Sequence, residues 1–176
     1  NRDAIPQLAA ALKKEPKSDI RAEIIAALGR IRDRSAVAPL AETLKTDLDK
    51  DVRSQAIDSL LRLYIPIEDS GALRTIFNRV KSVFLQPNAP VIPPGVQVDA
   101  AATEALAMAM QKDFDDQIRI QALRALGSLR ARDQVPALIM ALEDPQNREH
   151  RLVRVEIART LGVIRDPAAG PALERA

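Results

Sequence analysis

This chain of 176 residues contains no cysteine and no tryptophan, a single histidine and only 2% aromatic residues. The absence of cysteine excludes disulfides, zinc fingers, iron–sulfur ligation and thiol catalysis. One histidine excludes any metal site built from several imidazoles. Long apolar runs are missing as well: the longest uncharged stretch, residues 82–98, carries four prolines and therefore cannot form a membrane-spanning helix.

Catalytic signatures are also missing from the chain. It has no glycine-rich phosphate loop, no GxSxG nucleophile turn and no HExxH zinc motif. Asp47, Asp49 and Asp51 alternate as they would in a calcium loop, but the glycine and the terminal glutamate of such a loop are absent. We therefore predict a protein that is not an enzyme and that has no cofactor and no metal.

Hydrophobic residues make up 47% of the chain, which excludes a disordered protein, and they recur with a period of about 33 residues. In one helix type, A, apolar residues spaced by 4, 4 and 3 form a single stripe. An arginine follows the first apolar residue of each A stripe, at Arg21, Arg53, Arg119 and Arg154. A second type, B, is marked by Leu8, Leu40, Leu73, Leu106, Leu138 and Leu173.

Helical hairpins of this kind cannot bury their apolar stripes alone, so consecutive hairpins must stack. The pattern predicts an all-α fold, a right-handed α-solenoid of stacked antiparallel helical hairpins that forms a single domain over residues 1–176. The chain opens at one B helix and closes within another, and neither end shows a polar capping repeat. We therefore expect the domain to be a fragment of a longer chain.

Three segments carry a pattern that resembles a known family: residues 19–33, residues 118–129 and residues 153–166, each with an arginine early and an apolar-Leu-Gly or Thr-Leu-Gly string later. They resemble HEAT repeats, most closely the short HEAT-like type of phycobilisome lyases, over nearly all of the chain except about 85–99. The resemblance implies a HEAT/armadillo-like solenoid with A helices on the convex side and B helices on the concave side. It also implies that the arginine of each A helix pairs with an inter-repeat aspartate, the candidates being Asp47, Asp49, Asp51, Asp113, Asp115 and Asp116.

The repeat fails at about 85–99, where one A helix is due. Four prolines between residues 87 and 94 forbid a helix there and favour an extended, polyproline-like run. This non-helical insert replaces one A helix and is expected to leave a hole in the outer layer. Two interpretations remain open: the insert plugs the hole with Val91, Ile92 and Val96, or Val91 and Ile92 form a partner-facing or regulatory loop element.

The exposed face of the B helices is the predicted partner-binding site. Lys14, Arg79 and Lys112 share one repeat position and should form a basic row, while Met108 and Met140 share another and offer an adaptable apolar contact. The alternative is that the two methionines pack in the core or at its rim. The candidate binding residues on this concave face are Lys14, Lys45, Arg74, Asn78, Arg79, Met108, Gln111, Lys112 and Met140.

A second group of basic residues lies where one repeat step lengthens to 35 residues. It comprises Arg148, His150, Arg151 and Arg154. This group is either solvated surface or a contact for an anion or a nucleic acid, and the sequence leaves both open.

Together these observations favour a non-catalytic scaffold that binds a protein or peptide, with the basic row preferring an acidic segment. A first alternative is a HEAT-like module that binds the backbone of duplex nucleic acid, which a net charge of only +2 disfavours. A second, implied by the resemblance alone, is a bilin lyase-like protein that handles open-chain tetrapyrroles. The low aromatic content disfavours a chromophore pocket of that kind.

Overall fold

The computed structural model describes residues 3–65 and 92–175, and all regular structure within them is helical. The predicted all-α class is therefore confirmed. The helices are α1 (Ala4–Lys14), α2 (Ser18–Ile31), α3 (Val37–Thr46), α4 (Lys50–Tyr64), α6 (Ala100–Lys112), α7 (Asp116–Ser128), α8 (Val135–Glu143), α9 (Arg151–Ile164) and α10 (Gly170–Arg175). Short 3-10 turns precede α3, α8, α9 and α10: η1 (Arg34–Ala36), η2 (Arg132–Gln134), η3 (Pro145–Arg148) and η4 (Pro167–Ala169).

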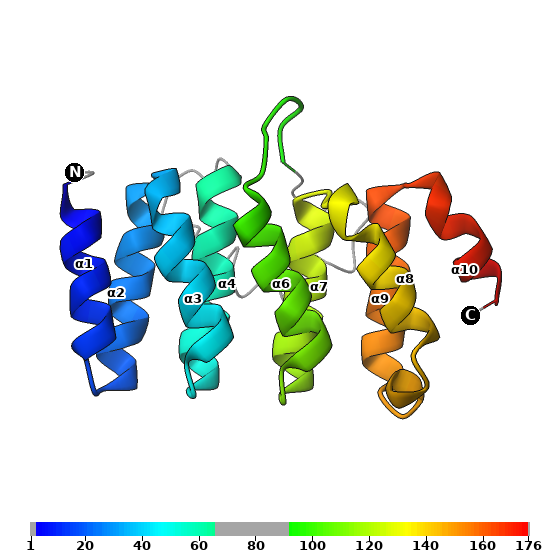
Figure 1. The fold of residues 1–176 in the computed structure, drawn as a ribbon, viewed down its shortest axis with the longest axis horizontal. Helices are drawn as coiled ribbons and strands as arrows, with labels where there is room; N and C mark the ends of the chain where they lie inside the picture. The colour runs from blue at the N-terminus through cyan, green and yellow to red at the C-terminus, as the bar shows by residue number, and fades with distance from the viewer. Residues whose placement is uncertain (1–2, 66–91, 176) are drawn as a thin grey trace, which may run out of the picture.

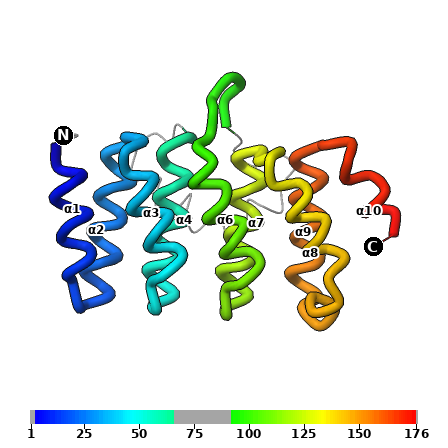
Figure 2. The backbone as a smooth tube through the Cα atoms, in the orientation of Figure 1, coloured from blue at the N-terminus to red at the C-terminus, as the bar shows by residue number. Residues whose placement is uncertain are grey.

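The helices form one row of antiparallel pairs, with α1, α3, α6 and α8 in front and α2, α4, α7 and α9 behind (Figure 1). We call the front row the B layer and the rear row the A layer. Within the A layer α2 packs on α4, α4 on α7 and α7 on α9, while in the B layer α3 packs on α6 and α6 on α8. The N-terminal and C-terminal ends lie at opposite ends of the row (Figure 2), so the molecule is an extended stack of hairpins, as predicted.

Aspartates set where several helices and turns begin. The Asp49 carboxylate accepts hydrogen bonds from the backbone N–H groups of Asp51 and Val52 at 2.8 and 3.3 Å, which caps α4. Asp33 and Asp166 accept hydrogen bonds from the backbone N–H groups two residues further on, at 2.9 and 3.0 Å. They cap the 3-10 turns η1 and η4, which lead into α3 and α10.

Three arginines end or follow the A helices in an unusual backbone conformation. Arg32, Arg130 and Arg165 have φ angles of 56°, 47° and 55°, in the left-handed region that glycine normally occupies at this position. The side chain of Arg32 shows one role of an arginine in this position. Its Nε donates to the carbonyl of Arg62, and its guanidinium also reaches the carbonyl of Ile65, so a cation meets the negative end of the neighbouring helix α4.

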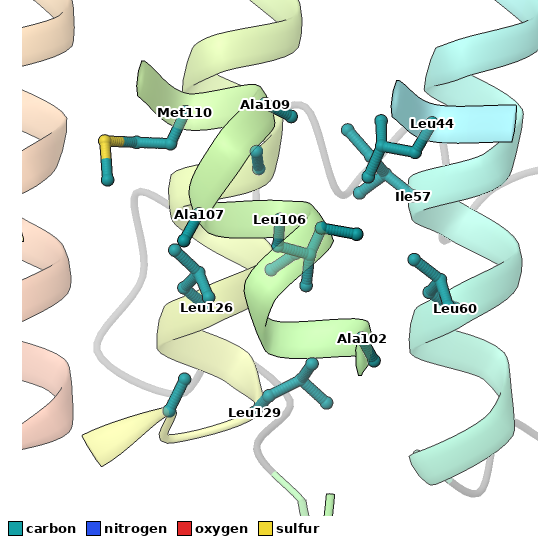
Figure 3. Packing of buried hydrophobic residues seen from close by; sticks show 14 of the residues in the cluster. Leu44, Ile57, Leu60, Ala102, Leu106, Ala107, Ala109, Met110, Leu126 and Leu129 are labelled. Atoms are coloured by element: carbon teal, nitrogen blue, oxygen red, sulfur yellow. The ribbon is translucent and has the colours of Figure 1, made fainter. Parts of the chain in front are cut away.

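Aliphatic side chains fill the space between the two layers and between successive hairpins. Leu44, Ile57 and Leu60 point from α3 and α4 toward α6, which presents Leu106 to them (Figure 3). All four are 2% exposed or less. Burying one such side chain contributes about 1.5–3 kcal/mol, so these contacts help to hold the two hairpins against each other.

The expected hole in the outer layer is absent between α4 and α7. These two helices pack directly on each other, and the Gln121 side chain of α7 donates to Asp58 of α4 at 2.9 Å and accepts from the Ser54 hydroxyl at 2.8 Å. In the other layer α6 packs directly on α3. The hole prediction is wrong because it assumed that each repeat of the sequence occupies its own place in the stack.

The described part of the insert is not helical and packs partly on the stack. Ile92, Val96 and Val98 are partly buried against the core, and the Ile92 backbone N–H donates to the Ser128 carbonyl at 3.0 Å. Gly95 provides the positive φ of 84° that the turn in this segment requires. Ile92 therefore packs on the stack without filling a hole between α4 and α7, whereas Val91 lies outside the described residues.

Candidate functional site

An arginine is the fourth residue of every long A helix, and the first two of these arginines use the same atoms. Nε and Nη2 of Arg21 donate to the two carboxylate oxygens of Asp47 at 2.7 and 2.9 Å. Nε and Nη2 of Arg53 donate to Asp113 in the same way, at 2.7 and 2.8 Å. In both cases Nη1 donates to two backbone carbonyls of the preceding connection. The predicted pairing of Arg21 and Arg53 with inter-repeat aspartates is confirmed.

These two ion pairs are charge-assisted and largely shielded from water. The side chains of Arg53 and Asp113 are 9% and 5% exposed, and those of Arg21 and Asp47 are 17% and 9% exposed. In each pair the hydrogen bond to the aspartate raises the pKa of the guanidinium above its ordinary value. Each pair thus joins an A helix to the end of the following B helix, which makes the ladder a structural device between hairpins.

The third arginine departs from this pattern. Nε of Arg119 donates to the carbonyl of Met110 at 2.9 Å, and Nη2 donates to the side-chain oxygen of Asn147 at 2.5 Å. Its contact with Asp116, one of the predicted candidates, spans 3.4 Å within the same helix. The inter-repeat partner is therefore an amide that the sequence analysis missed. Asn147 also donates to the Ala141 carbonyl at 2.7 Å, a bond that a carboxylate cannot make.

A groove of about 350 Å³ lies between the C-terminal ends of α3 and α6. Lys45, Met108 and Lys112, three of the predicted binding residues, line it together. Leu48 and Phe114 line it as well, from the connections that follow α3 and α6. These five residues, Lys45, Leu48, Met108, Lys112 and Phe114, are called the α3–α6 groove residues below.

Leu48 and Phe114 are the most exposed large apolar side chains of the described chain, at 97% and 103%. The sequence analysis missed both, although a signal was present. Each stands between two aspartates, in the strings Asp-Leu-Asp at 47–49 and Asp-Phe-Asp at 113–115, where the aspartates pair with arginines or cap helices. An apolar residue held between two engaged aspartates cannot turn into the core, so it projects into solvent.

The charge left over in this groove is positive. Asp47 and Asp113 line it, but both carboxylates are already held by Arg21 and Arg53. Lys45 and Lys112 are exposed and form no ion pair with any residue of 3–65 or 92–175. Two free cations beside three exposed apolar side chains are an arrangement suited to a ligand that is both acidic and apolar.

The remaining predicted residues are distributed more widely. Lys14 ends α1 and is exposed, Gln111 is exposed on α6, and Met140 is 71% exposed on α8. Met108 is 41% exposed, so neither methionine lies in the core, and packing at the rim of the core stays the alternative to a binding contact. Three further candidates, Arg74, Asn78 and Arg79, lie outside the described residues.

Two members of the predicted basic row, Lys14 and Lys112, belong to α1 and α6, and α3 lies between these helices (Figure 1). The third member, Arg79, lies outside the described residues, so the row stays a prediction. The lysine that shares a groove with Lys112 is Lys45. A second groove, of about 470 Å³, lies between α1 and α3 and also includes Leu48, so this leucine stands between two neighbouring hollows of the B layer.

A family model described as HEAT repeats matches residues 1–61 and 101–176, most of the chain on both sides of the insert. The chain belongs to the HEAT-repeat family. HEAT repeats generally serve as scaffolds for interactions between proteins. A search of curated proteins gives no match, so the resemblance of this HEAT-repeat protein to the phycobilisome-lyase type stays a prediction.

None of the helices in the described part of the HEAT-repeat stack combines the length and the apolar character that crossing a bilayer requires.

Proposed function

We propose that this HEAT-repeat protein is a non-catalytic scaffold that binds a partner polypeptide across the exposed face of its B layer. The α3–α6 groove is the centre of the proposed site. The observation that carries the proposal is the meeting, in one groove, of three exposed apolar side chains and two lysines that have no ion-pair partner among the residues that the structure describes. These features come from two hairpins that are far apart in the sequence and adjacent in the stack.

Apolar surface supplies the expected affinity. Phe114 and Leu48 expose their whole side chains, and Met108 adds a flexible thioether to the same groove. Aromatic and methionine side chains are enriched at protein interfaces because they bury a large area on binding. A partner that inserts an apolar side chain between Leu48 and Phe114 would remove both from water.

The charge of the groove supplies the expected specificity. Lys45 and Lys112 lie on the two helices that border the groove, and neither forms an ion pair within residues 3–65 and 92–175. We therefore infer that the bound segment carries at least one aspartate or glutamate next to its apolar residue. Rim charges of this kind mainly raise the association rate and reject basic competitors.

A peptide library displayed on phage and selected on the immobilised 176-residue protein tests the proposal. We expect the enriched peptides to combine an apolar residue with neighbouring acidic residues. Enriched peptides should lose at least tenfold in affinity for the double variants Leu48→Ser/Phe114→Ser and Lys45→Glu/Lys112→Glu, measured by fluorescence anisotropy.

Matched controls come from the A layer. Leu152 of α9 is 68% exposed, and Arg151 is exposed at the start of the same helix, so Leu152→Ser and Arg151→Glu change the same chemistry on the other layer. Both controls should bind the selected peptides as the unmodified protein does. Selected peptides that bind both double variants of the groove with unchanged affinity would refute the proposed site. So would peptides whose binding is lost in Leu152→Ser or Arg151→Glu, because the interaction would then lie on the A layer.

A further inference from the structure

The groove between α1 and α3 adjoins the α3–α6 groove. The helices α1, α3 and α6 follow one another along the front of the stack (Figure 1). Thr46, Asp47 and Leu48 line both grooves, and Leu48 is 97% exposed. Because the same residues border both, the two hollows meet across the C-terminal end of α3, with Leu48 between them.

The α1–α3 groove carries a charge of its own. Glu42 of α3 and Lys13 of α1 line it, both are exposed, and neither forms an ion pair within residues 3–65 and 92–175. Glu15 lines this groove as well, again without an ion-pair partner in the described part of the chain. Arg21 and Asp47 also border it, but these two neutralise each other. The remaining charges are two carboxylates and one ammonium group.

The sign of the remaining charge therefore reverses across α3. Glu42 lines only the α1–α3 groove and Lys45 only the α3–α6 groove, although the two residues lie three positions apart on one helix. Lys112 adds a second positive charge on the α6 side. A uniformly acidic ligand would be attracted on one side of α3 and repelled on the other, whereas a segment with one charge of each sign would be attracted on both.

The rest of the α1–α3 groove suits a long basic side chain. Leu12, which is 7% exposed, and Pro39 give it apolar surface. The Thr46 hydroxyl donates to the Glu42 carbonyl at 2.9 Å, so its oxygen can still accept a hydrogen bond. A lysine or arginine could therefore pack its methylenes on Leu12 and Pro39 while its charged end donates to the Glu42 carboxylate and to Thr46.

We propose that the partner segment crosses the C-terminal end of α3 and occupies both grooves. It places a lysine or arginine beside Glu42, an aspartate or glutamate beside Lys45, and an apolar residue on Leu48 between them. Neighbouring helices lie about 8–10 Å apart and an extended chain advances about 3.3 Å per residue, so about three to four positions separate the two charges. This inference rests on the proposed function and adds to it the order of charges along the bound segment.

Parallel selections of the phage-displayed peptide library test the inference. The library is selected on the unmodified 176-residue protein, on Glu42→Lys and on Glu23→Lys. Glu23 is an exposed glutamate of α2 that lines neither groove, so it is the matched control for the change of charge. Glu42→Gln, which removes the charge without reversing it, serves as a milder variant, and thermal unfolding checks that all three variants are folded.

We expect peptides selected on the unmodified protein and on Glu23→Lys to carry a basic residue three or four positions from an acidic one. Peptides selected on Glu42→Lys should lack this basic residue or have an acidic residue in its place. In fluorescence anisotropy, the tightest peptide of the first selection should lose about three- to fivefold in affinity for Glu42→Lys and less for Glu42→Gln. Changing the basic residue of this peptide to glutamate should restore its affinity for Glu42→Lys.

The inference would be overturned if changing the basic residue of the peptide had the same effect on the unmodified protein and on Glu42→Lys, because the segment would then not reach the α1–α3 groove. The proposed function would survive that result if the peptides still lost affinity for Leu48→Ser/Phe114→Ser and Lys45→Glu/Lys112→Glu. Peptides that bind these two variants unchanged would refute both. A duplex oligonucleotide that displaces the peptide and binds Glu42→Lys more tightly would identify a nucleic acid as the occupant and also overturn the inference.

Discussion

The two ends of the A layer contain the same kind of hydrogen bond between neighbouring helices, but the helices are packed more closely at the N-terminal end. At the N-terminal end the Ser59 hydroxyl of α4 donates to the Ile25 carbonyl of α2 at 3.0 Å. At the C-terminal end the Thr160 hydroxyl of α9 donates to the Leu123 carbonyl of α7 at 3.1 Å. Each bond lies beside a glycine of the same repeat position, yet the room around the two glycines differs.

A methyl group placed on Gly29 would lie 2.7 Å from the Ser59 hydroxyl oxygen and 3.0 Å from its Cα. On Gly127 the nearest atom would be the Thr160 methyl carbon, at 3.7 Å, which is an ordinary van der Waals distance. The arginines at the fourth position of the A helices are also held more firmly toward the N-terminal end. Carboxylates bind Arg21 and Arg53, an amide binds Arg119, and the Nε of Arg154 has no hydrogen-bond partner among the described residues. Equivalent positions of the repeat therefore do not contribute equally to stability.

The largest expected effect comes from the best shielded ion pair. Asp113→Ala removes the carboxylate from Arg53 and leaves its guanidinium buried, so we expect a loss of about 3–5 kcal/mol in the free energy of unfolding. Asn147→Ala removes a neutral amide from Arg119 and should cost only about 1–2 kcal/mol. Urea denaturation followed by circular dichroism measures both. Equal losses for the two variants would show that the carboxylate and amide junctions are equivalent after all.

The two glycines give a second contrast. Gly29→Ala pushes a methyl group into the side chain and backbone of Ser59, so we expect a loss of about 1–3 kcal/mol. Gly127→Ala meets no such obstacle, and the higher helix propensity of alanine should make it neutral or stabilising by up to about 1 kcal/mol. Thermal unfolding of the two variants in parallel tests the difference. A stabilised Gly29→Ala would mean that α2 and α4 separate more easily than their contacts indicate.

A smaller effect is expected where the two halves of the stack join. The Tyr64 hydroxyl at the end of α4 donates to the Asp99 carboxylate just before α6 at 2.6 Å. Tyr64→Phe should therefore cost about 1 kcal/mol. Burial, and then the bond to Asp99, raises the pKa of Tyr64 above its ordinary value of 10.0, so its contribution is complete below that value and is lost as the pH rises through the folded-state pKa.

Alkaline unfolding curves of the unmodified protein and of Tyr64→Phe measure this contribution. The difference in stability between them should be constant at neutral pH and should shrink well above pH 10, as the phenol ionises. A difference that already disappears between pH 7 and 9 would contradict the buried, protonated phenol.

The smallest effect concerns the contact between the starts of α2 and α4. Hydrogen bonds from the Ser18 side chain and then from the Asp51 backbone lower the pKa of Asp49. A lowered folded-state pKa means that the contribution is present above the unfolded-state value near 4 and is lost as the pH falls through the folded-state value. Ser18→Ala should raise the Asp49 pKa toward its ordinary value in a carboxyl ¹³C NMR titration. An unchanged titration would show that the Asp51 backbone alone sets it.

Much of the architecture was predictable because the apolar period reports it directly. The stripes around Arg21, Arg53, Arg119 and Arg154 correspond to α2, α4, α7 and α9, and the ladder leucines at 8, 40, 106, 138 and 173 lie in α1, α3, α6, α8 and α10. The 3.6-residue helical period and the need to bury one apolar stripe per helix are compatible with few arrangements of the helices other than stacked hairpins. The resemblance to HEAT repeats implied that Arg21 pairs with an inter-repeat aspartate, and the structure selects Asp47 among the candidates.

The candidate site was predicted only in part. Lys45, Met108 and Lys112 were expected on one face, but their common groove depends on α6 packing beside α3, across an interruption in the repeat that sequence spacing counts as a further unit. Leu48 and Phe114 were missed because the signal of their exposure lies in the aspartates on either side, and the structure is needed to show that these aspartates are held by arginines and helix starts.

The sequence by itself determined that the chain forms helical hairpins, which residues make up the apolar stripe of each helix, and where each A helix carries its arginine. All of these follow from local periodicity. Tertiary structure alone decided which hairpins are neighbours and how closely Gly29 and Gly127 approach the next helix. These features depend on distances between segments that are remote along the chain. Small differences in helix separation therefore decide which repeat positions tolerate a larger side chain.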